Sequence, residues 1–334
     1  MMKESANIQK DVESVLSDRR NAAVRLARER YNEVCDTIPD YRETDENIKR
    51  NGVKLGRLAL EGKSLSEEYA SLKKEIEERS RYRVMLLEKA GLKEDYLTDV
   101  YTCPLCQDTG EVISEHKKTF CSCYMKLYTE FLQKEANLIH NMGFEGFELK
   151  YYSEKAEDNS NSPLKNAEIA LDMSRKFVEN FGKPDLNNLM FTGGTGVGKT
   201  HLCGCIAYEF TKKGVPVLYL SAAELFDALT YYGEDRSKIA KREDLEKILY
   251  EVEILIIDDL GAEKQSAARY SILLELLNNR LDNKKVRRKT VVSSNLTLPQ
   301  IKNNYDEHIF SRLATFDICR LSGDDIRILK KLKK

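Results

Sequence analysis

The sequence predicts an α/β protein whose C-terminal half is built on a parallel five-stranded sheet covered by helices. Five short, β-branched apolar runs alternate there with helical patterns: NLMFT, VPVLYLS, EILIIDD, KTVVSSN and DICRLS. A glycine-rich loop follows the first run, and a pair of aspartates ends the third. This alternation is typical of strand–helix–strand units, in which each helix connects two parallel strands. The N-terminal half shows helical periodicity instead.

Composition limits the classes of protein to which the chain can belong. Its 334 residues suffice for about two domains, and 33% charged with 41% hydrophobic residues is typical of a soluble, helix-rich globular protein. A formal net charge of -1 argues against a broadly basic coat for nucleic acid and leaves room for a local basic strip. No apolar run approaches the roughly 20 residues that span a bilayer, and the N-terminus lacks the apolar core of a signal peptide. We therefore expect a cytoplasmic protein with no membrane partner, whose eight cysteines are thiols or metal ligands.

Two stretches of the N-terminal half, residues 5–35 and 64–90, place apolar side chains at helical spacing among mixed charges. Such stripes predict helices of a bundle or a short coiled coil. The pattern favours equally an ordinary solvated helical domain and an arm that docks onto a partner. A third helical stretch, MKLYTEFLQKEANL, precedes a polar run over 154–165 that is typical of a loop. We predict a helical region over 1–100, a cysteine-rich segment over 101–135, a linker over 136–165 and the α/β domain over 166–334.

The loop GGTGVGKT fits the phosphate-binding pattern G-x-x-x-x-G-K-[ST] and lies between a predicted strand and a predicted helix. Its glycines let backbone N–H groups turn toward phosphate oxygens, and the helix N-terminus adds partial positive charge. We expect Lys199 to contact the β- and γ-phosphates and the Thr200 hydroxyl to bind Mg²⁺. The alternative, a plain glycine-rich turn, fits this context poorly. The residues expected to bind the nucleotide here are Gly193, Gly194, Thr195, Gly196, Val197, Gly198, Lys199, Thr200 and His201.

Acidic side chains at the end of EILIIDDL predict where the metal and the attacking water bind. Open α/β sheets bind ligands at the carboxyl edge of their strands. We expect Asp258 to hold Mg²⁺, directly or through water, and Asp259 to orient or deprotonate the attacking water. Glu263 is a second candidate for polarising that water. For Asp259 and Glu263 the alternative role is to cap the following helix.

Asn295 and Arg312 complete the predicted catalytic set. Asn295 follows an apolar run, where it would hydrogen-bond the attacking water or the γ-phosphate; a turn-forming asparagine is the alternative. Arg312, in HIFSRLATF, would neutralise charge that develops on the γ-phosphate. An ordinary surface or ion-paired arginine is the alternative there.

Taken together, GGTGVGKTHL, LIIDDLGAE, SSNLT and FSRL resemble the AAA+ ATPases of the DnaC/DnaI helicase-loader type, with the IstB transposition helpers as near relatives. The resemblance covers roughly residues 145–330 and implies a AAA+ P-loop NTPase that hydrolyses ATP with Mg²⁺. It implies that Asn295 is the sensor-1 residue and that Arg312 is the arginine finger, acting on the nucleotide of a neighbouring subunit. Arg327 resembles the sensor-2 arginine, and the chain ends soon after it, which implies a reduced lid. His308 stands where many relatives have arginine, so activation between subunits is expected to differ here.

Four of the eight cysteines cluster as Cys103-x2-Cys106 and Cys121-x-Cys123. Four thiolates suit tetrahedral Zn²⁺; His116 is an alternative ligand and an iron–sulfur cluster an alternative occupant. This insert resembles the N-terminal part of DnaI-like loaders of Gram-positive bacteria and their phages, and we do not expect it in IstB-type proteins. The other cysteines lie in apolar segments and are expected in the core: Cys35, Cys203, Cys205 and Cys319.

The resemblance implies an ATP-dependent loader that controls the assembly of a replicative DnaB-type helicase on single-stranded DNA. Residues 1–135 would dock onto the helicase, and a second copy of the chain or a replication initiator is a further expected partner. The basic run DNKKVRRKT (282–290) would contact the phosphates of the single strand; a solvated charged surface is the alternative. Two rivals stay open, an IstB-like ATPase that regulates a transposase and a binding module with a degenerate nucleotide site. Intact Lys199 and Asp258 argue against the second.

Overall fold

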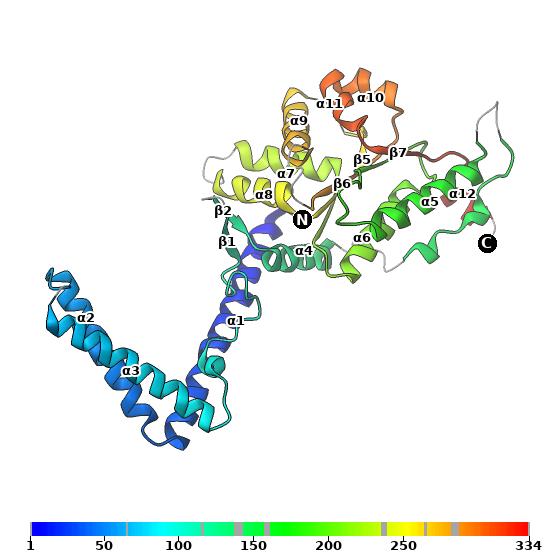
Figure 1. Ribbon diagram of the computed structural model, residues 1–334. Helices are drawn as coiled ribbons and strands as arrows, with labels where there is room; N and C mark the ends of the chain where they lie inside the picture. The colour runs from blue at the N-terminus through cyan, green and yellow to red at the C-terminus, as the bar shows by residue number, and fades with distance from the viewer. Residues whose placement is uncertain are drawn as a thin grey trace. The chain divides into compact units, whose positions relative to one another are not determined.

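The computed structural model describes residues 2–64, 66–114, 117–136, 143–156, 161–234, 239–263, 266–281 and 287–332 (Figure 1). The chain divides into two compact units, one formed by Ser14–Thr109 and the other by Met1–Glu13 together with Gly110–Lys334. This division differs from the four predicted ranges, because the first turns of the N-terminal helix belong with the C-terminal unit.

The unit Ser14–Thr109 is helical, as its periodicity predicts. It contains most of α1 (Met2–Thr37), then α2 (Tyr41–Leu60), α3 (Glu67–Lys89) and the short 3-10 helix η1 (Glu94–Leu97). Helices α1 and α3 lie where the apolar stripes predict them. Helix α2 was not predicted, since it contains two glycines and few apolar positions. A small core holds the helices together: Val34, Ile38, Tyr41, Leu86 and Leu87.

A buried carboxylate connects the three helices of this unit. The Asp45 side chain is only 4% exposed. It accepts hydrogen bonds from the hydroxyl of Tyr31 at 2.9 Å and from Nη1 of Arg83 at 2.8 Å, and it pairs with Nζ of Lys49 at 2.6 Å. Burial by itself would raise the pKa of Asp45, but Lys49, Arg83 and Tyr31 stabilise the ionised form, so the pKa is lowered. The carboxylate is therefore an ionised link between α1, α2 and α3.

The C-terminal unit contains the predicted parallel sheet. Its five strands are the five predicted runs: β3 (Leu189–Thr192), β4 (Val217–Ser221), β5 (Ile254–Leu260), β6 (Lys289–Ser294) and β7 (Asp317–Arg320). They lie in the order β4-β5-β6-β3-β7, and every neighbouring pair is parallel. The loop after β3 therefore emerges beside the carboxyl ends of β6 and β5, where the predicted polar residues lie.

Helices accompany every strand of the sheet. Helices α5 (Pro163–Glu179) and α6 (Lys199–Lys212) pack against each other, and so do α7 (Ala222–Glu234), α8 (Ile239–Glu251) and α9 (Ala267–Leu281) (Figure 1). The short helices α10 (Leu298–Tyr305) and α11 (Glu307–Leu313) follow β6. After β7, the described residues form one further helix, the seven-residue α12 (Ile326–Leu332).

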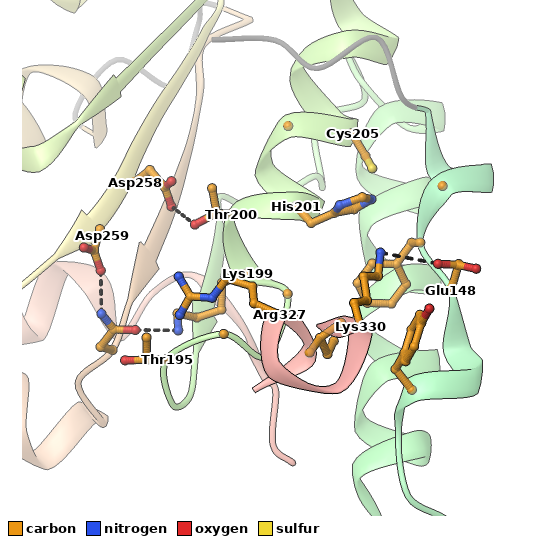
Figure 2. Close-up of a pocket in the computed structure, with 18 of the residues that line it drawn as sticks. Glu148, Thr195, Lys199, Thr200, His201, Cys205, Asp258, Asp259, Arg327 and Lys330 are labelled. Carbon is orange, nitrogen blue, oxygen red and sulfur yellow. Dashed lines mark hydrogen bonds and ion pairs between the residues drawn. The ribbon is translucent and has the colours of Figure 1, made fainter. Parts of the chain in front are cut away.

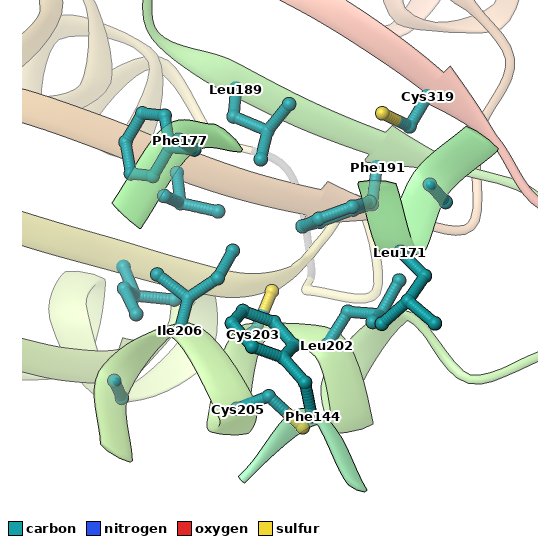
Figure 3. Packing of buried hydrophobic residues seen from close by; sticks show 14 of the residues in the cluster. Phe144, Leu171, Phe177, Leu189, Phe191, Leu202, Cys203, Cys205, Ile206 and Cys319 are labelled. Carbon is teal, nitrogen blue, oxygen red and sulfur yellow. The ribbon is translucent and has the colours of Figure 1, made fainter. Parts of the chain in front are cut away.

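The main core fills the space between the sheet and helices α5 and α6. Figure 3 shows Leu189 and Phe191 of β3 beside Leu202 and Ile206 of α6. The predicted core cysteines of this unit, Cys203, Cys205 and Cys319, are all buried, whereas Cys35 in the helical unit is half-buried. Packing of α6 against the sheet fixes the helix whose first residues are Lys199 and Thr200.

The cysteine-rich segment continues into a small hairpin of β1 (Glu111–Ser114) and β2 (Lys117–Phe120), followed by α4 (Ser122–Ala136). Phe120 connects this hairpin to α8, because its N–H donates to Oε2 of Glu251 at 3.2 Å. The ring of Phe120 also stacks on Tyr124 of α4, with 4.4 Å between ring centres.

Part of the predicted linker over 136–165 packs into the core of the C-terminal unit. It forms two 3-10 turns, η2 (Phe144–Gly146) and η3 (Leu149–Tyr151), and the side chains of Phe144, Phe147 and Tyr152 are buried. Their aromatic surface stabilises the packed state by leaving water. A linker over 136–165 was predicted because the run 154–165 is polar. For Phe144, Phe147 and Tyr152 that prediction is wrong, since they lie in the core.

Candidate nucleotide site

The phosphate loop between β3 and α6 bends through glycines with positive φ. The values are 139° at Gly193, 77° at Gly196 and 99° at Gly198. A Cβ atom on Gly193 would lie 2.0 Å from the carbonyl oxygen of Leu321, and one on Gly198 would lie 2.6 Å from the hydroxyl of Tyr152. Glycine is required here by both conformation and space.

A cavity of about 760 Å³ opens beside this loop at the carboxyl edge of the sheet (Figure 2). It is lined by five of the predicted residues, Lys199, Thr200, Asp258, Asp259 and Asn295. Aromatic and apolar side chains also line it, among them Phe147, Tyr152, His201, Cys205 and Ile326, and so does the ion pair of Glu148 with Lys330. A mixture of charged groups and aromatic rings suits the phosphates and the base of a nucleotide.

The ammonium group of Lys199 is held by three oxygens. It donates to the carbonyls of Gly193 at 2.7 Å and Gly194 at 2.6 Å, and to Oδ1 of Asn295 at 2.6 Å. Burial lowers the pKa of Lys199, and the negative charges of Asp259 and Asp258 oppose that shift. A buried cation held by weak carbonyl acceptors is well suited to pair with phosphate oxygens.

Asn295 connects Lys199 to Asp259. Its Nδ2 donates to Oδ1 of Asp259 at 2.5 Å. Asp259 has a φ of 58°, in the left-handed region, and its N–H donates to Oγ of Ser293 at 3.0 Å. The turn points the carboxylate toward Asn295, so the predicted water-handling pair meets at one edge of the cavity (Figure 2).

Three hydroxyl groups surround the carboxylate of Asp258. Thr200 Oγ1 lies 3.3 Å from Oδ1, the Ser293 hydroxyl also donates to Oδ1, and the Tyr219 hydroxyl donates to Oδ2 at 2.7 Å. Carboxylate and hydroxyl oxygens are ligands that suit Mg²⁺, so Asp258 with Thr200 fits that ion. Tyr219 and Ser293 were not predicted, because a single polar residue inside an apolar run gives no periodic signal.

The aromatic segment before α5, which includes Phe147 and Tyr152, packs against the phosphate loop and the start of α6. The Tyr152 hydroxyl donates to the carbonyl of Val197 at 2.9 Å, and the ring of Phe147 lies 5.8 Å from that of His201. Burial raises the pKa of Tyr152, so its hydroxyl stays a donor. Thr195 and His201 line the cavity, as predicted.

Three further predicted residues take different places. Among the described residues that line the cavity, Arg327 is present, whereas Glu263 and Arg312 are not. The carboxylate of Glu263 accepts from the N–H of Gly261 at 2.9 Å and from the hydroxyl of Tyr305. These contacts hold Glu263 in its own turn, and neither of them is with the first residues of α9, so its roles on the water or as a helix cap both stay predictions.

Arg312 and Arg327 both have partners on their own chain. Arg312, on α11, donates to Oδ1 of Asn278 and to the carbonyl of His308, the latter at 3.0 Å. Arg327, on α12, pairs with Asp325 at 2.9 Å, and the charge of Asp325 raises the pKa of Arg327. Arg327 is therefore next to the cavity of its own chain and Arg312 is away from it.

The four cysteines predicted to bind a metal lie together. The sulfur atoms of Cys103, Cys106, Cys121 and Cys123 are all within 4.8 Å of one another. Sulfurs bound at about 2.3 Å in a tetrahedron would be about 3.8 Å apart, so the group fits Zn²⁺. Asp108 shapes the first loop by accepting from the N–H groups of Thr102 at 2.8 Å and Cys103 at 3.0 Å. His116 lies outside the described residues.

Of the basic run 282–290, the structure describes the side chains of Arg287, which is exposed, and of Arg288 and Lys289, so contact with a single strand stays a prediction. Arg287 lies over the ring of Phe181, 4.7 Å from its centre, and Lys289 donates to the carbonyl of Leu186. Arg288 is half-buried, and burial lowers its pKa. Arg287 and Lys289 thus contact the protein itself, while Lys284 and Lys285 lie outside the described residues.

None of the helices in the described part of the chain is long and apolar enough to cross a membrane. The strand order, the phosphate loop and the polar ends of β5 and β6 define a P-loop nucleotide-binding protein of the AAA+ type. Residues 153–320 match the family model described as IstB-like ATP binding protein. The chain belongs to that family.

Curated relatives carry the name replicative helicase loader DnaC. The protein of Escherichia coli (strain K12) is 26% identical over 144 residues, which are 43% of this chain and 56% of that protein. The protein of Buchnera aphidicola subsp. Schizaphis graminum is 26% identical over 176 residues, 53% of this chain and 64% of that protein. The chain thus spans little more than half the length of the curated relatives it matches.

Among solved structures, the crystal structure of the DnaC helicase loader is similar with a TM-score of 0.41 and 22% identity, covering 53% of this chain and 98% of that one. The crystal structure of DnaI gives a TM-score of 0.40 and 22% identity, covering 53% and 90%.

Proposed function

We propose that this protein is an ATP-dependent loader of a replicative DnaB-type helicase, which hydrolyses ATP to control assembly of the helicase on single-stranded DNA. The names of the curated relatives support the helicase as partner. The meeting of Lys199, Asp259 and Asn295 at one edge of the cavity is the observation that best supports hydrolysis rather than binding alone. The cysteine cluster favours a loader over an IstB-like regulator of a transposase.

In the proposed reaction Lys199 exchanges its carbonyl partners for the β- and γ-phosphates, and Thr200 with Asp258 holds Mg²⁺. Mg²⁺ neutralises negative charge between the two phosphates. Asp259 orients the attacking water and accepts its proton, since its carboxylate lies at the same edge. Asn295 contacts both Lys199 and Asp259, so its hydrogen bonds would change when a γ-phosphate binds.

Arg312 acts in the proposed mechanism on the nucleotide of a neighbouring subunit. Its place on α11, away from the cavity lining of its own chain, supports this. Its two acceptors, Asn278 and His308, hold the guanidinium in one position. Arg327 would contact the phosphates of its own chain from α12 after leaving Asp325.

Residues 1–135 are proposed to dock onto the helicase, with Zn²⁺ held by Cys103, Cys106, Cys121 and Cys123. A metal stabilises a segment too small to form a core of its own.

Co-purification with a replicative helicase in ATP and in ADP tests the whole proposal. The wild-type chain should retain the helicase in a nucleotide-dependent manner, and Lys199→Ala should lose both this dependence and ATP hydrolysis. Lys176→Ala, which changes an exposed lysine on α5, is the matched control. Recovery of a transposase in place of the helicase would reject the loader, and equal hydrolysis by wild type and Lys199→Ala would reject the enzyme.

A further inference from the structure

The buried side chain of Tyr219 contacts the carboxylate of Asp258. Tyr219 lies on β4 with 7% of its surface exposed and belongs to the main core. In the parallel pairing of β4 with β5, Ser221 is the partner of Asp258, and Tyr219 is two residues earlier on the same face. The hydroxyl of Tyr219 therefore reaches Oδ2 of Asp258, at 2.7 Å.

The two oxygens of Asp258 have different neighbours. Oδ1 faces Thr200 Oγ1 and accepts from Ser293, whereas Oδ2 accepts from Tyr219. Thr200 is the other proposed ligand of the metal, so Oδ1 is the oxygen on the metal side. The bond from Tyr219 holds the carboxylate against rotation and occupies the second oxygen.

This arrangement is maintained by burial. The hydroxyl of Tyr219 lies in the main core, where it donates to Oδ2 of Asp258. Loss of its acceptor would leave a buried hydroxyl without a partner, which is costly. The bond between Tyr219 and Asp258 is thus a stable part of the site.

We propose that Tyr219 is a positioning residue that makes Asp258 a one-oxygen ligand and thereby selects Mg²⁺ over Ca²⁺. Mg²⁺ requires near-octahedral geometry and few carboxylate oxygens, whereas Ca²⁺ accepts a carboxylate through one or both oxygens. Removing the Tyr219 hydroxyl frees Oδ2 and lets the carboxylate turn. The inference rests on the proposed function, because it requires that Asp258 bind the metal of the nucleotide.

The test is Tyr219→Phe in the full chain, which keeps the buried ring and removes only the hydroxyl. ATP binding is titrated against MgCl₂ and against CaCl₂ by calorimetry, and Mn²⁺ binding is followed by electron paramagnetic resonance. Removing a hydrogen bond to a metal ligand costs about 10-fold or more in metal affinity, so we expect the Mg²⁺ requirement to rise about 10-fold. The Ca²⁺ requirement should change little, and ATP affinity in EDTA should stay the same.

Tyr208→Phe is the matched control, since this half-buried tyrosine of α6 is not among the residues that line the cavity. A role in packing alone would lower thermal stability without changing the ratio of Mg²⁺ to Ca²⁺ affinity. An unchanged ratio in Tyr219→Phe, with normal Mg²⁺ dependence in the wild type, would overturn the inference and leave the proposed function standing. A wild-type chain that fails to bind ATP in the presence of either metal would overturn both.

Discussion

Oδ1 of Asn295 accepts a hydrogen bond from the ammonium group of Lys199 at 2.6 Å, across 96 positions of sequence. On its other side, the same amide donates to Asp259 at 2.5 Å. The amide can satisfy both neighbours in one orientation only, with oxygen toward the cation and nitrogen toward the carboxylate. A phosphate that displaces Lys199 from Asn295 therefore changes the surroundings of Asp259.

We predict that Asn295→Ala lowers the rate of ATP hydrolysis by about 100-fold, the usual cost of losing one polar group that acts in the transition state. Binding of ATP should be nearly unchanged, because Lys199 and the glycine-rich loop, which bind the phosphates in the proposed mechanism, are left intact. Single-turnover hydrolysis and equilibrium binding separate the two effects. Asn303→Ala, on the exposed side of α10, is the control. An equal loss of binding and hydrolysis would contradict this role.

Gly198→Ala should impair the phosphate loop through strain. The residue has a φ of 99°, and the new Cβ would lie 2.6 Å from the hydroxyl of Tyr152 and 3.1 Å from Phe147. We expect a loss of stability of about 1–3 kcal/mol and weaker ATP binding. Gly204→Ala, inside α6, the helix that begins after Gly198, places a Cβ atom with nothing within 4 Å and should raise stability by about 0.5–1 kcal/mol. Thermal unfolding followed by circular dichroism compares the two, and similar melting temperatures would refute the argument.

Arg312→Ala should keep ATP binding and lose hydrolysis, by about 1,000-fold if Arg312 is an arginine finger. The decisive measurement is a mixture of Arg312→Ala with Lys199→Ala. Each variant supplies what the other lacks, so mixed assemblies should regain activity if the arginine acts between subunits. A mixture no more active than the sum of its components would exclude that arrangement.

Removal of the metal should disorder the cysteine segment without abolishing ATP binding, because these ligands are separate from the cavity lining. We expect one equivalent of zinc per chain by elemental analysis, lost in Cys103→Ser. Cys35→Ser, which changes a half-buried cysteine outside the cluster, should retain it. Iron in place of zinc would indicate the alternative, an iron–sulfur cluster.

Asp45 gives the helical unit a defined pH dependence. Because the pKa of Asp45 is lowered in the folded chain, its ion pairs stabilise the fold at pH values above the unfolded pKa of about 3.9. This contribution is lost as the pH falls below that value, when the carboxylate becomes protonated. Asp45→Asn should cost about 3 kcal/mol at neutral pH and flatten the loss of thermal stability below about pH 4. Asp36→Asn, which removes an exposed pair with Arg42, should change neither the stability at neutral pH nor its loss below about pH 4.

Local patterns determined a large part of this protein in advance. The phosphate loop, the five strands and the four cysteines could all be found because each depends on residues close together in sequence. Helix α2 could not, since Gly52 and Gly56 weaken the helical signal and its buried side includes a charge, Asp45. The aromatic segment of Phe144 and Tyr152 was hidden by the polar run that follows it.

Only the tertiary structure determined the contacts between strands and helices that are distant in sequence. Tyr219 reaches Asp258 because β4 and β5 pair in one register, and a shift of one residue would turn it to the other face. Arg280 is buried, and its guanidinium donates to the carbonyls of Leu249 and Val252 at 2.7 and 3.0 Å. Nothing in the sequence around Arg280 distinguishes it from an exposed arginine on a helix. Composition and periodicity specify which side chains leave water, whereas the partner that each buried polar group finds depends on how the elements pack.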